Sequence, residues 1–160
     1  MSDLPVLLIA MFVLAGLFNV IFPILLGWWI IRKHKTNWKL FGVGVLTFIG
    51  SQIFHLPVVN GLTAAFQSGA LPHVDPNFAP FFNAIVLGLL AGLFEETARW
   101  IGFKLLKKKG DSLGAALTLG AGHGGIEAII IGGVVLFSLI SMLSLRSVGV
   151  ESLPLSAEQL

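Results

Sequence analysis

Four long apolar stretches constrain this chain more than any other feature. They cover approximately residues 4–31, 38–59, 80–106 and 112–145 of a chain of 160 residues. A helix of about 20 apolar residues is long enough to cross a bilayer, so each stretch can span one. The sequence therefore predicts an all-α fold, a polytopic transmembrane helix bundle with about four spanning helices. We expect one integral membrane domain over 1–160 that forms an N-terminal part of a longer bundle, with a polar tail at 146–160.

The composition agrees with this class of fold. Only 11% of the residues are charged, whereas soluble domains have about 25%. The net charge is +2, and its basic residues lie in short loops, which is typical of topology signals rather than of nucleic-acid binding. The chain has no cysteine, which excludes disulfides, thiolate metal ligands and thiol nucleophiles.

The basic residues also predict an orientation. They fall in two loops, at 32–39 and 104–109, while the loop at 60–79 has no Lys or Arg. Because positive loops stay in the cytoplasm, we expect both basic loops to be cytoplasmic and the N-terminus to lie outside.

The third apolar stretch carries an unexpected group of charges. Glu95, Glu96 and Arg99 lie within it, although one charge near the bilayer centre costs roughly 2.5–3.5 kcal/mol. Such residues must be paired and face protein or water, and their usual explanation is a functional site. Arg99 follows Glu95 by four residues, so the two side chains can pair on one helix face.

The fourth stretch supplies a matching polar pair, His123 and Glu127. Lys109 lies midway between Glu95 and His123. In an antiparallel helical hairpin around Lys109, Glu95 and His123 should lie at the same depth, near the middle of the membrane. The four-residue spacing places Glu127 on the face of His123.

This group suits metal-assisted or carboxylate-assisted hydrolysis. A Glu and a His can hold a divalent metal with an open position for water, and a second Glu can take the proton of that water. We expect zinc, with His123, Glu95 and Glu127 as ligands, a catalytic set that also contains Glu96, and Arg99 as an orienting residue.

Small residues flank the polar positions. Gly88 and Gly92 share a face with Glu96, and Gly120 and Gly124 belong to a small-residue stripe on the fourth stretch. Such stripes let helices approach closely in lipid, so we expect these four glycines at helix contacts. His55 lies roughly 25 Å along the second helix, which predicts a place near the outer interface and a hydrogen bond that packs helices.

Two other functions fit the same residues. Intramembrane Glu and His residues also serve as proton relays, which would suit a component of a proton- or cation-coupled transporter. The charges can instead pair only to hold helices together, which would suit a non-catalytic membrane scaffold or an immunity-like protein.

The segments 92–99 and 120–128 resemble the YhfC family of intramembrane metalloproteases, which is similar to the CAAX-prenyl and bacteriocin-processing membrane endopeptidases. The resemblance implies Glu95 and Glu96 as water-activating carboxylates, His123 as a ligand or partner, and Glu127 as a further site residue. It also implies a membrane-embedded or membrane-anchored peptide substrate and a bacterial or archaeal cell membrane. The wider group has three residues between its second Glu and its Arg, whereas two intervene here. Members have a later His-bearing helix, so a truncated, inactive member is a further expectation.

Overall fold

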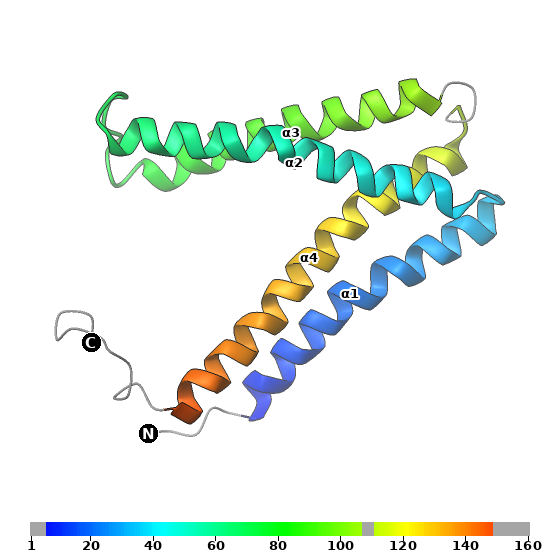
Figure 1. Cartoon of the computed structure of the whole chain (residues 1–160), viewed down its shortest axis with the longest axis horizontal. Helices are drawn as coiled ribbons and strands as arrows, with labels where there is room; N and C mark the ends of the chain where they lie inside the picture. The colour runs from blue at the N-terminus through cyan, green and yellow to red at the C-terminus, as the bar shows by residue number, and fades with distance from the viewer. Residues whose placement is uncertain (1–5, 107–110, 149–160) are drawn as a thin grey trace. The chain divides into compact units, whose positions relative to one another are not determined.

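The computed structural model describes residues 6–106 and 111–148, and its regular structure there is entirely helical. The four helices are α1 (Val6–His34), α2 (Trp38–Gln67), α3 (Ala79–Leu106) and α4 (Leu113–Val148) (Figure 1). Each is long and apolar enough to cross a membrane, which confirms the predicted all-α, polytopic membrane fold. Lys107, Lys108 and Lys109 and most of the predicted tail lie outside the described residues.

The largest difference between a helix and the apolar stretch that predicts it is in α2. α2 continues to Gln67, beyond the predicted end at Val59, because residues 60–67 contain no proline that would end it. It ends where Gly69 adopts a positive φ of 76°, a conformation that glycine takes without strain. α4 runs without a break to Val148.

Side chains define where two of the helices begin. Asn37 precedes α2, and its side chain accepts a hydrogen bond from Leu40 N at 3.2 Å. Ser112 precedes α4, and its hydroxyl accepts one from Ala115 N at 3.1 Å. Both contacts satisfy backbone donors that a helix start otherwise leaves unpaired.

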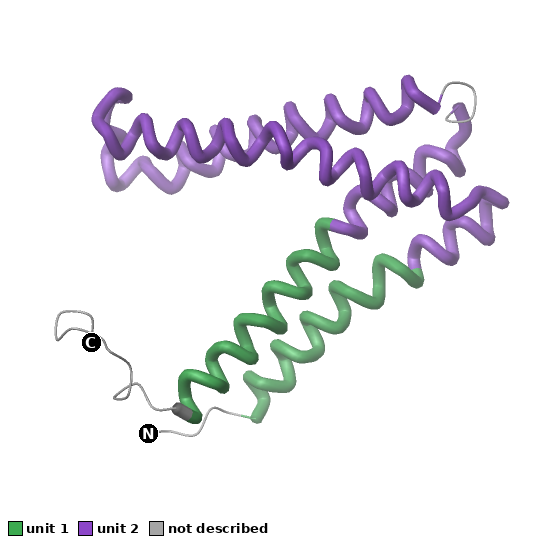
Figure 2. Tube along the Cα trace, in the orientation of Figure 1, with its two compact units in different colours: residues 1–25, 127–160 green, residues 26–126 purple. Residues whose placement is uncertain are grey.

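The contacts divide the chain into two compact units, residues 1–25 with 127–160 and residues 26–126 (Figure 2). The single domain over 1–160 therefore stays a prediction. In the first unit, α1 and α4 approach closely at two glycines. A Cβ atom on Gly132 would lie 2.8 Å from the Gly16 carbonyl oxygen.

The second unit contains the antiparallel pair α2 and α3, which lie side by side (Figure 1). Their register follows from three contacts along the pair: Thr47 with Gly102, His55 with Phe94, and Phe66 with Phe82. This register places the middle of α2 beside the acidic segment of α3.

In the same unit, α4 crosses α2 with the two backbones in direct contact. A Cβ atom on Gly44 would overlap the Leu119 carbonyl oxygen, and one on Gly122 would overlap the Phe41 carbonyl oxygen. Glycine is therefore required at both positions of the crossing. The four glycines that the sequence predicts at helix contacts are Gly88, Gly92, Gly120 and Gly124. A Cβ atom added to any one of them would instead meet no other heavy atom within 4 Å.

Candidate functional site

His123 is the centre of the polar group in the second unit. It lies on α4 and is 1% exposed. Its backbone nitrogen would lie 2.8 Å from a Cβ atom on Gly44 of α2, and its ring packs edge-to-face on Phe48 at 5.4 Å between centroids. The imidazole is thus held against α2 by close backbone packing and by an aromatic ring.

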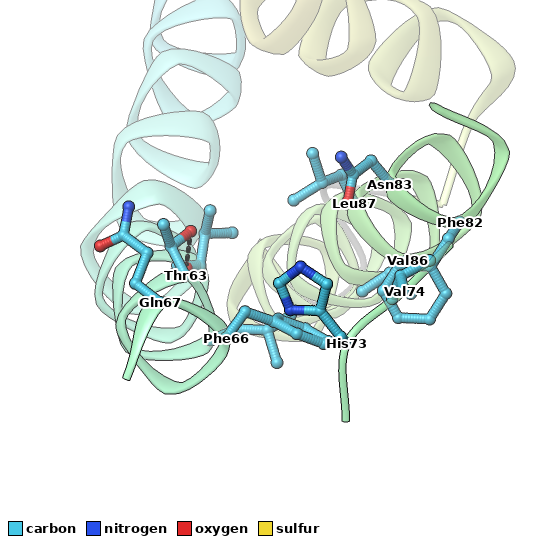
Figure 3. Close-up of a pocket in the computed structure, with 11 residues that line it drawn as sticks. Thr63, Phe66, Gln67, His73, Val74, Phe82, Asn83, Val86 and Leu87 are labelled. Carbon is cyan, nitrogen blue, oxygen red and sulfur yellow. Dashed lines mark hydrogen bonds between the residues drawn. The ribbon is translucent and has the colours of Figure 1, made fainter. Parts of the chain in front are cut away.

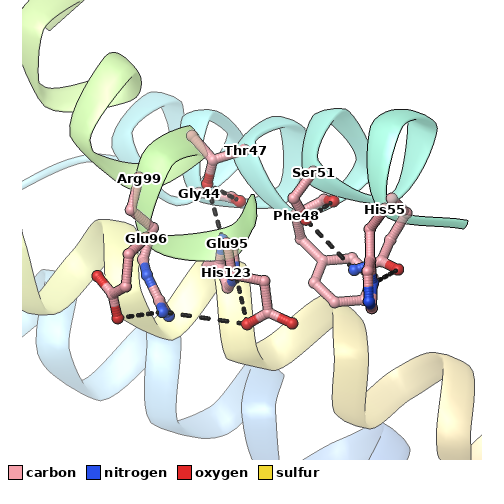
Figure 4. A network of polar contacts seen from close by, with 10 residues as sticks. Gly44, Thr47, Phe48, Ser51, His55, Glu95, Glu96, Arg99 and His123 are labelled. Carbon is pink, nitrogen blue, oxygen red and sulfur yellow. Dashed lines mark hydrogen bonds and ion pairs between the residues drawn. The ribbon is translucent and has the colours of Figure 1, made fainter. Parts of the chain in front are cut away.

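Both ring nitrogens of His123 contact polar side chains (Figure 4). Nδ1 lies 2.9 Å from the Thr47 hydroxyl oxygen on α2, and Nε2 lies 3.4 Å from Oε2 of Glu95 on α3. The structure therefore brings together Glu95 and His123, as the predicted hairpin requires.

The Thr47 hydroxyl relates its own hydrogen bonds to the tautomer of the ring. Its oxygen lies 2.7 Å from the Gly44 carbonyl oxygen, to which it donates. A hydroxyl has one proton, so when this proton goes to Gly44 the Thr47 oxygen accepts from His123, and Nδ1 carries the ring proton. In the neutral ring of this tautomer, Nε2 presents a lone pair to Glu95.

In this tautomer two electron-pair donors face each other at 3.4 Å, the imidazole Nε2 and the carboxylate Oε2. Such a pair is repulsive unless a positive charge lies between the two atoms. A proton or a metal cation would supply it. Two ligands of a tetrahedral zinc ion, each about 2.0–2.1 Å from the metal, are roughly 3.3 Å apart, so the pair has the spacing of two zinc ligands.

The neighbouring acid and arginine complete the polar surface of α3. Arg99 pairs with Glu96 at 2.5 Å and approaches Glu95 at 4.0 Å. The Glu96 side chain is 73% exposed, whereas that of Glu95 is 18% exposed. Arg99 therefore lies between the two carboxylates and contacts Glu96 more closely than Glu95, the partner that the four-residue spacing predicts.

The remaining predicted ligand is Glu127, which is half-buried on α4. It belongs to the first unit, and its part in the site stays a prediction. Within residues 6–106 and 111–148, no three His, Asp or Glu side chains lie close enough to hold one metal ion. The described part of the site thus contributes two donors.

Thr47 was not among the residues predicted from the sequence. A single threonine in an apolar helix has no spacing that marks it as functional. The one available signal is Gly44, three residues earlier, whose carbonyl accepts the hydroxyl proton. That signal becomes interpretable only when α4 is known to cross α2 at Gly44.

His55 on α2 lies at the level of the acidic segment of α3. Its ring is 5.7 Å from that of Phe94, the residue before Glu95, and so it lies beside the acidic segment. His55 is 17 residues after the start of α2 at Trp38, whereas Phe94 is 12 residues before the end of α3 at Leu106. The expected place near the outer interface stays a prediction.

A hydrogen-bonded chain also orients His55. Its Nδ1 lies 3.3 Å from Gln52 Oε1, the Gln52 amide donates to Ser51, and Ser51 donates to the Phe48 carbonyl oxygen. Its Nε2 is buried without a hydrogen-bond partner among the described residues. The predicted packing bond is thus made within α2 rather than between helices.

Two hollows accompany α2 and α3. One, of about 680 Å³, is mostly apolar and includes Thr47 and Ser51 in its wall. The other, of about 430 Å³, lies between the end of α2 and the start of α3, with His73 and Asn83 at its edge (Figure 3). On α2, the first residue that lines this second hollow is Val59, twelve residues after Thr47. Neither Glu95 nor His123 lines it.

Comparisons with known proteins agree with the motifs. A family model described as YhfC intramembrane metalloprotease matches residues 18–158. The uncharacterized membrane protein YhfC of Bacillus subtilis (strain 168) is 34% identical over 134 residues, which are 79% of this chain and 48% of that protein. The chain thus spans about half the length of this curated relative. No solved structure matches.

Proposed function

The chain belongs to the YhfC intramembrane metalloprotease family, and from this premise we propose that it is an intramembrane peptidase. The single observation that supports the proposal is the Glu95–His123 pair, whose Oε2 and Nε2 atoms lie 3.4 Å apart. Both residues lie in helices that can span a membrane. The substrate would be a membrane-embedded or membrane-anchored peptide.

Glu95 and His123 are the residues that would hold a divalent cation, with zinc as the metal we expect. Their spacing suits two corners of a tetrahedral site, and the sequence predicts Glu127 as a further ligand. A bound cation would polarise the scissile carbonyl and make water more acidic.

Glu96 is the carboxylate that would accept the proton of the attacking water. Its side chain is exposed, and Arg99 holds it in an ion pair. The water oxygen would add to the carbonyl carbon, the carbon–nitrogen bond would break, and the proton on Glu96 would pass to the leaving amine. Arg99 would orient the Glu96 carboxylate for this transfer through their ion pair.

The first test is the metal content of the full chain in lipid nanodiscs. We expect about one zinc per chain in the wild type and little in Glu95→Gln or His123→Ala, because each variant removes one donor. His73→Ala is the matched control, since this imidazole lies in the separate hollow. Zinc that is absent from the wild type, or lost equally in the control, would contradict the proposed metal site.

A proton relay is the second candidate, and the same facing pair favours it. A proton between Nε2 and Oε2 would satisfy both atoms as well as a metal would. This function predicts a proton flux across sealed vesicles that Glu95→Gln abolishes, without cleavage of any membrane peptide. Cleavage together with zinc binding would favour the peptidase.

A further inference from the structure

Thr47 is held in one orientation by contacts on both sides. It is 8% exposed on α2. Its methyl group faces α3, where a Cβ atom on Gly102 would lie 2.6 Å from Thr47 Cγ2. Its hydroxyl faces the Gly44 carbonyl and His123 Nδ1. Gly102 leaves room for the methyl group, so the hydroxyl keeps its direction toward the imidazole.

We propose that Thr47 is a positioning residue that selects the tautomer of His123. With the hydroxyl proton donated to Gly44, Nδ1 donates to the Thr47 oxygen. Nε2 is thereby kept as a lone pair directed at Glu95. The tautomer is argued from the contacts of Thr47 with Gly44 and His123, and only the use of Nε2 as a metal ligand rests on the proposed function.

An ordinary helical threonine would act differently. Threonine hydroxyls often bond to a carbonyl in the preceding turn of their own helix, with no effect on other helices. If Thr47 did only this, its removal would leave the His123 proton where it is. If Thr47 selects the tautomer, its removal leaves Glu95 as the better acceptor, and the proton moves to Nε2.

Two substitutions separate these cases. Thr47→Val keeps the shape and the methyl group beside Gly102 but removes the hydroxyl, whereas Thr47→Ser keeps the hydroxyl. We expect the metal-free valine variant to carry its His123 proton on Nε2 and the serine variant to resemble the wild type. Should the valine variant fail to fold, Thr47→Ala removes the same hydroxyl with less bulk.

The measurement is nitrogen NMR of the full chain in nanodiscs, with ¹⁵N-labelled histidine rings. Protonated and unprotonated ring nitrogens differ widely in chemical shift, and His123→Ala assigns the His123 signals. His55 is the internal reference, because its Nδ1 bonds to Gln52 within α2 and should not respond to Thr47. A His123 tautomer that is the same in Thr47→Val and the wild type would overturn the inference.

Zinc affinity gives an independent readout. Loss of a partner that orients a ligating histidine weakens metal binding by about 10–100-fold, so we expect this loss in Thr47→Val and not in Thr47→Ser. If the wild type binds no zinc but shows the expected tautomers, the proposed function fails and the role of Thr47 stands. If zinc binds and Thr47→Val changes neither readout, the role of Thr47 fails alone.

Discussion

Two adjacent acids of one helix have different surroundings. Glu95 is mostly buried and faces His123, whereas Glu96 is exposed and pairs with Arg99. Consecutive residues of a helix point about 100° apart, because a turn contains about 3.6 residues. One carboxylate therefore faces the α4 imidazole and the other is exposed, which suits the proposed ligand and the proposed base respectively.

This division predicts that two isosteric substitutions differ in their effects. Glu95→Gln should lose both zinc and peptide cleavage. Glu96→Gln should keep zinc and lose cleavage by about 100-fold or more, because a general base contributes roughly 10²–10⁴-fold. Zinc per chain and the cleavage rate of a fluorogenic transmembrane peptide are the measurements. Asp111→Asn is the control. Loss of zinc in Glu96→Gln would contradict the assignment of Glu96 as a base rather than a metal ligand.

At the scale of the helices, the site depends on how closely α2 and α4 cross. Gly44 and Gly122 let the backbones touch, and this contact brings His123 within hydrogen-bond distance of Thr47. Small residues allow such approaches in lipid, where dispersion between helices replaces the hydrophobic effect. The same crossing buries His123 beside Phe48.

We expect Gly44→Ala to destabilise the chain by about 1–3 kcal/mol, since the added methyl group would overlap the Leu119 carbonyl oxygen. Gly50→Ala on the same helix is the matched control. Its added methyl group meets nothing within 4 Å, and alanine favours a helix by about 1 kcal/mol over glycine. Denaturant unfolding in detergent measures both, and equal stabilities would contradict the close crossing.

At the scale of the whole molecule, four helices that each cross the bilayer would place both loops that carry most of the basic residues on the same side. The positive-inside rule predicts that this side is the cytoplasm. The Ser68 segment, which has no Lys or Arg nearby, would then face outward.

The chain has no cysteine, so single cysteines report this orientation without background. In intact cells, an impermeant maleimide should label Ser68→Cys and leave Asp111→Cys unlabelled. Both positions are exposed, and neither change removes a positive charge. Labelling of both variants after the cells are opened is the control. The reverse pattern in intact cells would invert the predicted topology.

The sequence alone determined the helical membrane fold, because apolar stretches of this length leave few other structures in lipid. It also predicted that Glu95 and His123 would meet, since equal distances from Lys109 place them at one depth of a hairpin. It did not predict Thr47, the level of His55 or the glycines of the crossing. Those depend on rotation and offset between helices, and apolar periodicity carries little information about either in a chain surrounded by lipid. Only the packing of α2 against α3 and α4 decided which hydroxyl reaches His123, and therefore which ring nitrogen faces Glu95.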